Sequence, residues 1–164
     1  MNKVLPKPYQ LRLVGQSEEK EIKNLIFSVL KEYGLPVNEQ AGPDVDLNDI
    51  PKYYSLEAGS PFWVVLDEAE EIVGTMALHR ESDHTCELRK MYLSKKARGL
   101  GLGKAMMKYV IGVAKELGYK TITLETDSVL KEAVIVYQKF GFVPYHNPHI
   151  CDRCDTAMKL DIIE

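Results

Sequence analysis

The fold of this chain is decided by the stretch Arg98-Gly99-Leu100-Gly101-Leu102-Gly103-Lys104, which lies between a strand-like segment at 86–93 and an apolar helical repeat. The first backbone N–H groups of a helix have no intrahelical partner, and the helix dipole adds positive charge there. Glycine has no Cβ, so a ligand can approach the backbone closely. The stretch therefore predicts a phosphate-binding loop, to which Lys95 and Lys96 add positive charge.

Two familiar phosphate-binding loops do not fit this stretch. A Walker A loop needs a glycine where this chain has Arg98 and a serine or threonine where it has Ala105. A dinucleotide-binding G-x-G-x-x-G pattern that starts at Gly99 has Lys104 in place of its third glycine. The remaining alternative is a flexible glycine turn that binds nothing.

Downstream of the loop, the chain predicts a helix and then a strand. Apolar residues recur every three or four positions from Leu102 to Leu117, and Gly118 ends the repeat. The segment 121–126, TITLET, is rich in residues that favour strands. A strand, a helix and a strand in succession favour a parallel pair between 86–93 and 121–126.

A second helix and a final strand pair complete the downstream half. Either Asp127 or Ser128 is expected to cap this helix, which ends at Gly141. Segments 142–146 and 155–163 are expected to pair as strands. The apolar face of the helix consists of Leu130, Ala133, Val134, Tyr137 and Phe140.

Upstream of the loop, three closely spaced strands are predicted at 62–67, 72–80 and 86–93, with connections too short for crossovers. They therefore form an antiparallel meander. The chain opens with an alternating strand at 9–14 and a helix that Ser17 is expected to cap. The apolar face of that helix is Ile22, Leu25, Ile26, Val29, Leu30 and Tyr33. The expected class is a mixed α+β fold with helices covering one sheet.

The acidic stretch 35–61 has no clear pattern beyond a short helix expected at 46–55. It forms either one wall of a binding site or a plain connector. Its acidity at 39–57 favours a cationic ligand.

Composition narrows the function classes. The 164 residues suit one domain at 1–164, and a net charge of −3 gives no electrostatic case for nucleic acid as a partner. No apolar run approaches a membrane span, and the start lacks the apolar core of a signal peptide. Three cysteines are too few for a disulfide framework. We therefore expect a cytoplasmic protein in a reducing compartment.

Three motifs in order resemble the GNAT superfamily of acyl-CoA-dependent N-acyltransferases. Arg98 to Gly103 match its Gln/Arg-x-x-Gly-x-Gly/Ala loop, and 87–93 looks like its fourth strand. Ala133-x-x-x-Tyr137-x-Lys139-Phe140-Gly141-Phe142 resembles its later helix-to-strand motif. The resemblance implies a seven-stranded, mostly antiparallel sheet flanked by about four helices. It also implies an N-acetyltransferase that uses acetyl-CoA as co-substrate and needs no metal.

The resemblance also implies where acetyl-CoA binds. Its pyrophosphate would lie on the amides of Arg98, Gly99, Leu100, Gly101, Leu102, Gly103 and Lys104. Its pantetheine arm would pair like an added strand with Met91, Tyr92 and Leu93. Lys139, within the third motif, is a further expected contact. One departure is Leu130, since many relatives have a cofactor-contacting asparagine at this position.

Amide formation needs a proton acceptor for the amine and a proton donor for the leaving thiolate. By the resemblance, Tyr137 is the donor, although its place on the apolar helix face also fits a core residue. Glu125, 12 residues earlier, resembles the base of the ribosomal-protein and N-terminal acetyltransferases. Glu87 is the rival base, and either glutamate could instead be a solvated strand residue. A backbone N–H near Met91 or Tyr92 would stabilise the thioester oxygen.

The pattern His146-x-x-His149-x-Cys151-x-x-Cys154 allows three interpretations. It has zinc-ligand spacing, its C-x-x-C can act as a redox pair, and its residues can simply be loop and strand residues near the acceptor. The resemblance favours the third, since Cys154 and Asp155 look like the start of the family's last strand, which holds no metal.

The acceptor is expected to be a primary amine of a small molecule, protein or peptide, acetylated directly without a covalent enzyme intermediate. The alternatives are a catalytically silent acyl-CoA sensor, an acyltransferase that uses a longer acyl chain, and a small zinc-binding interaction domain. Two copies are expected to pair through the sheet edge formed by the last strands.

Overall fold

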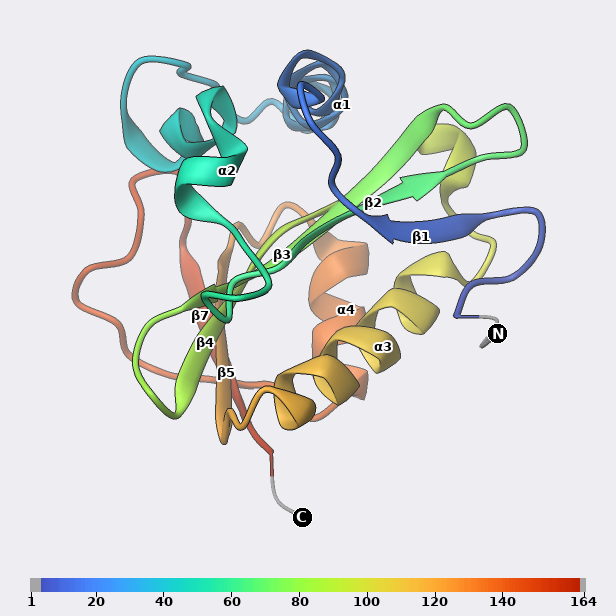
Figure 1. Cartoon of the computed structure of the whole chain (residues 1–164). Coiled ribbons are helices and arrows are strands. Elements are labelled where there is room, and N and C mark those ends of the chain that lie inside the picture. The colour runs from blue at the N-terminus through green and yellow to red at the C-terminus, as the bar shows by residue number, and fades with distance from the viewer. Residues whose placement is uncertain (1–3, 163–164) are drawn as a thin grey trace.

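A single seven-stranded sheet runs through the molecule, a computed structural model that describes residues 4–162. Its strand order is β1-β2-β3-β4-β5-β7-β6, and β4 with β5 is its parallel pair (Figure 1). The strands are β1 (Gln10–Leu13), β2 (Phe62–Leu66), β3 (Ile72–Arg80), β4 (Thr85–Leu93), β5 (Thr121–Thr126), β6 (Val143–Pro144) and β7 (Thr156–Asp161). The expected mixed, mostly antiparallel sheet is confirmed.

Helices cover both faces of this sheet (Figure 1). On one face α1 (Glu19–Glu32) and α2 (Ile50–Tyr53) lie beside the 3-10 segment η1 (Gly42–Asn48). On the other face lie α3 (Leu102–Glu116) and α4 (Lys131–Lys139). A short 3-10 turn, η2 (Lys95–Ala97), leads from β4 into the glycine loop. Each face has its own buried apolar cluster, because successive side chains along a strand point to opposite faces of the sheet.

Two expected helix caps are wrong. Ser17 has a left-handed backbone (φ 59°) outside the helix, and the Glu18 side chain instead accepts a hydrogen bond from the Gly15 N–H. Neither Asp127 nor Ser128 caps α4, whose N-cap residue is Leu130. The Asp127 side chain closes a turn by accepting the Val129 N–H at 2.9 Å, an arrangement that aspartate favours as strongly as a cap.

The observed helix and strand boundaries mostly lie within one or two residues of those expected from the sequence, and three details differ. The first strand is shorter than 9–14. The stretch 46–55 divides between η1 and α2. The last residue of the strand expected at 155–163, Ile163, lies outside the described residues. No helix within 4–162 is long and apolar enough to cross a membrane.

A β-bulge in β4 shapes the centre of the molecule. Thr75 pairs with Tyr92 while Ala77 pairs with Arg89, so β4 carries one extra residue opposite β3. Lys90 supplies it with a left-handed backbone (φ 56°), and its carbonyl accepts the Thr75 hydroxyl at 2.6 Å. The last pair between the two parallel strands joins Leu88 of β4 to Leu124 of β5, and beyond the bulge β4 no longer pairs with β5. The two strands therefore diverge at the middle of the sheet.

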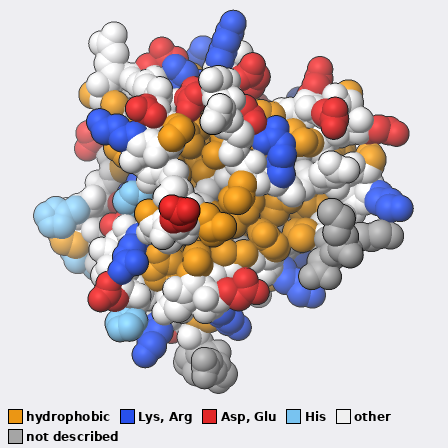
Figure 2. All heavy atoms as spheres, in the orientation of Figure 1, with side chains coloured by type: hydrophobic (Ala, Val, Ile, Leu, Met, Phe, Trp, Pro, Cys, Tyr) orange, Lys and Arg blue, Asp and Glu red, His pale blue; other side chains and the backbone are white. Residues whose placement is uncertain are grey.

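The face shown in Figure 2 has hydrophobic side chains across its middle and charged side chains of both signs around them. Neither sign forms a continuous patch on this face.

Candidate active site

Two cavities meet where β4 and β5 diverge. The loop cavity, about 760 Å³, extends toward the start of α3, and the carboxylate cavity, about 370 Å³, extends under η1. The wall common to both consists of Met91, Tyr92, Leu130, Ala133 and Tyr137. The two cavities therefore adjoin at Tyr137 and at Met91 and Tyr92 of β4.

The loop cavity is lined by the glycine loop. Gly99 and Gly101 both have left-handed backbones (φ 74° and 82°), which only glycine adopts without strain. Gly101 is the N-cap of α3, and no side chain within residues 4–162 bonds to the first amides of this 15-residue helix. Helix starts of this kind, with free amides and a positive dipole end, commonly bind anions such as phosphate.

Arg98 already has partners at this cavity. Its Nε donates to the Leu93 carbonyl at 3.0 Å, and its two Nη atoms pair with the Glu32 carboxylate of α1. Its guanidinium also lies 5.4 Å from the centre of the Tyr33 ring. Arg98 thus joins the loop to the end of α1, and its pKa is raised chiefly by the hydrogen bond to Glu32.

Of the other basic residues, Lys95 and Lys104 line the loop cavity and form no ion pair with any described residue. Lys96 instead pairs with Asp67 at 3.4 Å. Two residues expected near the cofactor do not line the cavity: the Leu100 side chain is exposed, and Lys139 lies on an exposed part of α4. Of the residues expected to bind the cofactor phosphates, Lys104 and most of the glycine loop line this cavity, together with Lys95.

The two candidate bases both line the carboxylate cavity. Glu87 lies opposite Thr123 in the parallel β4–β5 pair, so Glu125, two residues further along, emerges on the same face of the sheet. Glu87 forms an ion pair with Arg89, the next residue on that face of β4. Glu125 has neutral donors instead: its Oε1 accepts the Cys151 N–H at 3.1 Å and the Asn147 Nδ2 at 3.3 Å.

These surroundings affect the protonation of Glu125. Burial and the nearby Glu87 carboxylate raise the pKa of Glu125 above its ordinary value, and the Cys151 N–H opposes that rise. A carboxylate with a raised pKa is a stronger proton acceptor. Oε2 of Glu125 accepts no hydrogen bond from the described residues, so it is the oxygen available to a ligand.

Tyr137 lies in the common wall of the two cavities and is 6% exposed. Its ring packs 6.0 Å from that of Phe142, so its body belongs to the core. Burial raises the pKa of its hydroxyl above the usual range for tyrosine. Tyr137 is therefore both a core residue and a protonated group at the junction of the cavities.

A buried ionic cluster that the sequence did not predict lies along one side of the carboxylate cavity. Lys90 Nζ lies 3.0 Å from Asp46 Oδ1 and 3.4 Å from Asp44 Oδ1. Arg153 binds the same Asp44 carboxylate with both Nη atoms, and Tyr54 donates to Asp46 at 2.5 Å. The acidity of 39–57 was visible in sequence, but its cationic partners come from β4 and from the loop before β7.

The C-x-x-C motif forms a disulfide between Cys151 and Cys154, both of which line the carboxylate cavity. A single disulfide is not the framework of several that three cysteines are too few to form, and Cys86 is a free, buried thiol. The disulfide fits the redox-pair interpretation, and the other two interpretations stay predictions. Within residues 4–162, no group of three histidine, cysteine or acidic side chains could hold a metal ion.

Comparison with known proteins identifies this architecture. A family model described as "Acetyltransferase (GNAT) family" matches residues 26–142. The chain belongs to the GNAT family of acetyltransferases. The uncharacterized N-acetyltransferase YjgM of Escherichia coli (strain K12) is 33% identical over 145 residues, which cover 87% of this chain and 86% of that protein. The GNAT enzyme described here is accordingly an acyltransferase with N-acetyltransferase activity.

Solved structures agree on the GNAT fold. A GNAT-family acetyltransferase from Staphylococcus aureus Mu50 superimposes with a TM-score of 0.85 at 25% identity, covering 93% of this chain and 98% of that one. YncA from Salmonella typhimurium, solved with its cofactor acetyl-CoA, superimposes with a TM-score of 0.72. The superposition covers 96% of each chain, but the two sequences are only 17% identical, so this likeness supports the fold alone.

Proposed function

We propose that this GNAT enzyme transfers an acetyl group from acetyl-CoA to a primary amine of a small molecule or a peptide. The observation that carries the proposal is that the loop cavity and the carboxylate cavity share a wall containing Met91, Tyr92 and Tyr137. One cavity offers anion-binding amides, and the other offers a base. A thioester at the shared wall would face an amine held on the opposite side.

The loop cavity suits the charged and extended parts of acetyl-CoA. Its pyrophosphate fits the free amides at the start of α3, with Lys95 and Lys104 supplying positive charge. Beyond the bulge, Tyr92 and Leu93 of β4 pair with β3 on one side only, so the other edge of Met91–Leu93 can pair with the amide groups of a pantetheine arm. When bound, acetyl-CoA supplies the electrophilic thioester carbonyl.

The residues of the carboxylate cavity supply the proton transfers. Glu125 accepts a proton from the ammonium form of the acceptor, directly or through a water, so that the nitrogen lone pair can attack. A backbone N–H of Met91 or Tyr92 stabilises the thioester oxygen as it gains charge. Tyr137 gives its proton to the sulfur as the C–S bond breaks, and regains one from the nitrogen that becomes the amide.

The charges of this cavity favour an acceptor that arrives as an ammonium ion. The buried cluster is internally balanced, because Asp44 and Asp46 are paired with Lys90 and Arg153. The charges that remain on the lining are the carboxylates of Glu87, Glu125 and Asp127 and the single guanidinium of Arg89. This excess of negative charge attracts a cation, and the Arg89 pair leaves Glu87 less available as a base than Glu125.

The test is acetyl-CoA-dependent release of CoA, measured by chromatography over a panel of spermidine, L-lysine, L-aspartate, an aminoglycoside and a peptide with a free N-terminus. Isothermal calorimetry with CoA is run in parallel. We expect CoA binding and acetylation of at least one amine. CoA binding without release for any amine, or with release only from longer acyl-CoA donors, would contradict the proposed activity. No CoA binding would contradict the assigned cavity as well.

A further inference from the structure

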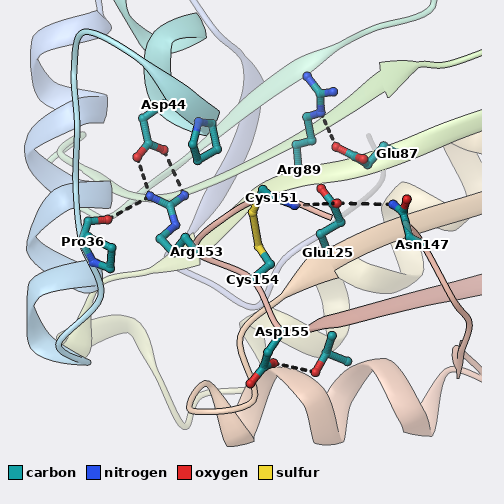
Figure 3. Close-up of a disulfide and its surroundings, with 12 residues drawn as sticks. Pro36, Asp44, Glu87, Arg89, Glu125, Asn147, Cys151, Arg153, Cys154 and Asp155 are labelled. Atoms are coloured by element: carbon teal, nitrogen blue, oxygen red, sulfur yellow. Dashed lines mark hydrogen bonds and ion pairs between the residues drawn. A yellow bond between two sulfur atoms is a disulfide. The ribbon is translucent and has the colours of Figure 1, made fainter. Parts of the chain in front are cut away.

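The Cys151–Cys154 disulfide closes a turn that holds the two sides of the carboxylate cavity (Figure 3). At one end of the turn, the Cys151 N–H donates to Glu125. Inside the turn, Arg153 reaches the opposite side of the cavity, where it bonds Asp44 and the Pro36 carbonyl at 3.2 Å. The covalent bond therefore fixes the Cys151 N–H, which bonds to Glu125, relative to Arg153, which bonds to Asp44.

The orientation of Glu125 depends on this segment. Both hydrogen bonds that its carboxylate accepts come from the stretch 147–151, and both fall on Oε1 (Figure 3). Asn147 is four residues before the disulfide and Cys151 is part of it. A base must be held within a fraction of an ångström to act efficiently, so freedom in this turn would lower the rate.

The disulfide is placed where a reductant can reach it. Cys151 and Cys154 are both half-buried and line an open cavity, whereas Cys86 is fully buried. Neither sulfur belongs to the lining of the loop cavity. Opening the bond would thus affect the carboxylate cavity and leave the anion-binding groups of the loop cavity in place.

We propose that the Cys151–Cys154 disulfide is a redox-sensitive positioning element for Glu125, so that the oxidised enzyme is the efficient acetyltransferase and the reduced enzyme is slowed. A reductant of the dithiol class reverses the bond. One of its thiolates attacks one sulfur of the disulfide, and its second thiol releases the protein. Two electrons and two protons pass to Cys151 and Cys154, and the reductant becomes a disulfide. The proposal rests on the proposed function of Glu125 as the base.

The experiment compares the oxidised enzyme, its form reduced with a water-soluble phosphine, and the double variant Cys151→Ser/Cys154→Ser. The phosphine delivers the same two electrons and becomes a phosphine oxide, while water supplies its oxygen and the two protons that the thiols gain. Mass spectrometry after alkylation counts the free thiols. The probe is the amine of the panel above that the oxidised enzyme acetylates fastest. We expect reduction and the double substitution each to lower kcat/KM for that amine about tenfold, while the Kd for CoA changes less than twofold.

A second readout separates positioning from general loosening of the structure. Loss of the Cys151 N–H bond raises the pKa of Glu125 further, so its titration, followed by carbon-13 NMR of labelled glutamate, should move to higher pH on reduction. This shift requires no acceptor. The other groups that face Glu125 are unchanged by reduction: Glu81, Glu87, Arg89 and Tyr145.

The controls make each outcome decisive. Cys86→Ala should still respond to the reductant, and the double serine variant should not. Equal kcat/KM and equal Glu125 titration in the oxidised and reduced states would overturn the redox proposal while leaving the acetyltransferase intact. A protein that shows three free thiols without any reductant would overturn it too. No acetylation in either state, with a shifted Glu125 titration, would contradict the proposed function and support the positioning.

Discussion

Tyr137 is a core residue in the structure, and the proposed function also makes it the proton donor. Its ring belongs to the apolar face of α4 and packs against Phe142, and the residue is part of the wall shared by the two cavities. Burial keeps this hydroxyl protonated, which is the state that a proton donor needs.

Replacing Tyr137 by phenylalanine removes the hydroxyl and keeps the packed ring. If Tyr137 protonates the leaving thiolate, kcat should fall by about 10²–10⁴-fold, the usual contribution of a general acid, with little change in the Kd for CoA. Steady-state kinetics and calorimetry measure the two effects. Tyr109→Phe, on a ring that packs against Trp63 away from both cavities, is the matched control and should keep its kcat.

The two glutamates of the carboxylate cavity can be separated by pH dependence. Activity requires the carboxylate of the base, and burial raises the pKa of Glu125, so kcat/KM should fall with decreasing pH through a value above 4.5. Glu125→Gln should abolish this acidic limb and lower kcat/KM about 10²-fold or more. Glu87→Gln should retain the limb, and its loss in that variant would make Glu87 the base.

Glu125 should also lower the stability of the fold at neutral pH. Because its folded pKa is raised, the folded state binds more protons than the unfolded state between the two pKa values, and stability falls as pH rises through this interval. Glu125→Gln should therefore raise Tm at pH 7 relative to the wild type and lose this advantage below about pH 4. Calorimetric scans at both pH values measure it, and an unchanged Tm at pH 7 would contradict the burial argument.

At the scale of elements, β4 and η1 are joined by charge. The bulge of β4 turns the Lys90 side chain, 5% exposed, into the pair of aspartates from η1, while its carbonyl stays bonded to Thr75. Lys90 thus lies at the point where β4 diverges from β5, and it also holds η1 over the carboxylate cavity through Asp44 and Asp46. Asp46 Oδ1 has no other partner among the described residues.

Removing the cation should therefore leave a buried charge without compensation. We expect Lys90→Met to lower the free energy of unfolding by about 3–5 kcal/mol at pH 7, the usual cost of removing one partner of a buried ion pair. Urea denaturation measures this loss. Lys96→Met, which breaks an exposed pair with Asp67, is the matched control and should cost far less. Equal losses in the two variants would show that the buried cluster contributes no more than a surface pair.

At the scale of the whole molecule, the loop cavity joins elements from most of the chain. Its lining includes the end of α1, the second half of β4, the start of α3 and one face of α4. A ligand that spans these elements binds the folded state alone, so it should stabilise the molecule as a unit.

CoA at 100 times its Kd should stabilise the fold by about 2.7 kcal/mol, or roughly 5–11 °C in Tm for a chain of this size. Gly103→Glu should abolish the shift, since its carboxylate would occupy the anion site. Gly103→Ala is the control: its Cβ would lie 4.0 Å from Leu93 Cδ1, an ordinary contact, and it should retain the shift. Differential scanning fluorimetry measures all three proteins, and a shift retained by Gly103→Glu would exclude the loop as the CoA site.

Local signals in the sequence determined the helices and strands and the position of the glycine loop. The apolar spacing from Leu102 to Leu117 and the alternation around Glu125 predict a helix and a strand because these patterns depend on neighbours a few residues apart. Gly99 and Gly101 predict the loop because only glycine adopts its left-handed backbone freely. The same locality explains the wrong caps, since Ser17 and Asp127 suit turns as well as helix ends.

Contacts between distant parts of the chain were decided only by the tertiary structure. Asp44 meets Arg153 across 109 positions, Arg98 meets Glu32 across 66, and Cys151 meets Glu125 across 26. Charge pairing and hydrogen bonding act through space, and no local pattern records which partner the folding of the sheet will bring near. The chain sequence thus determined a helix-flanked sheet with a glycine loop before α3, while packing decided which charges are paired and which stay unpaired on the cavity walls.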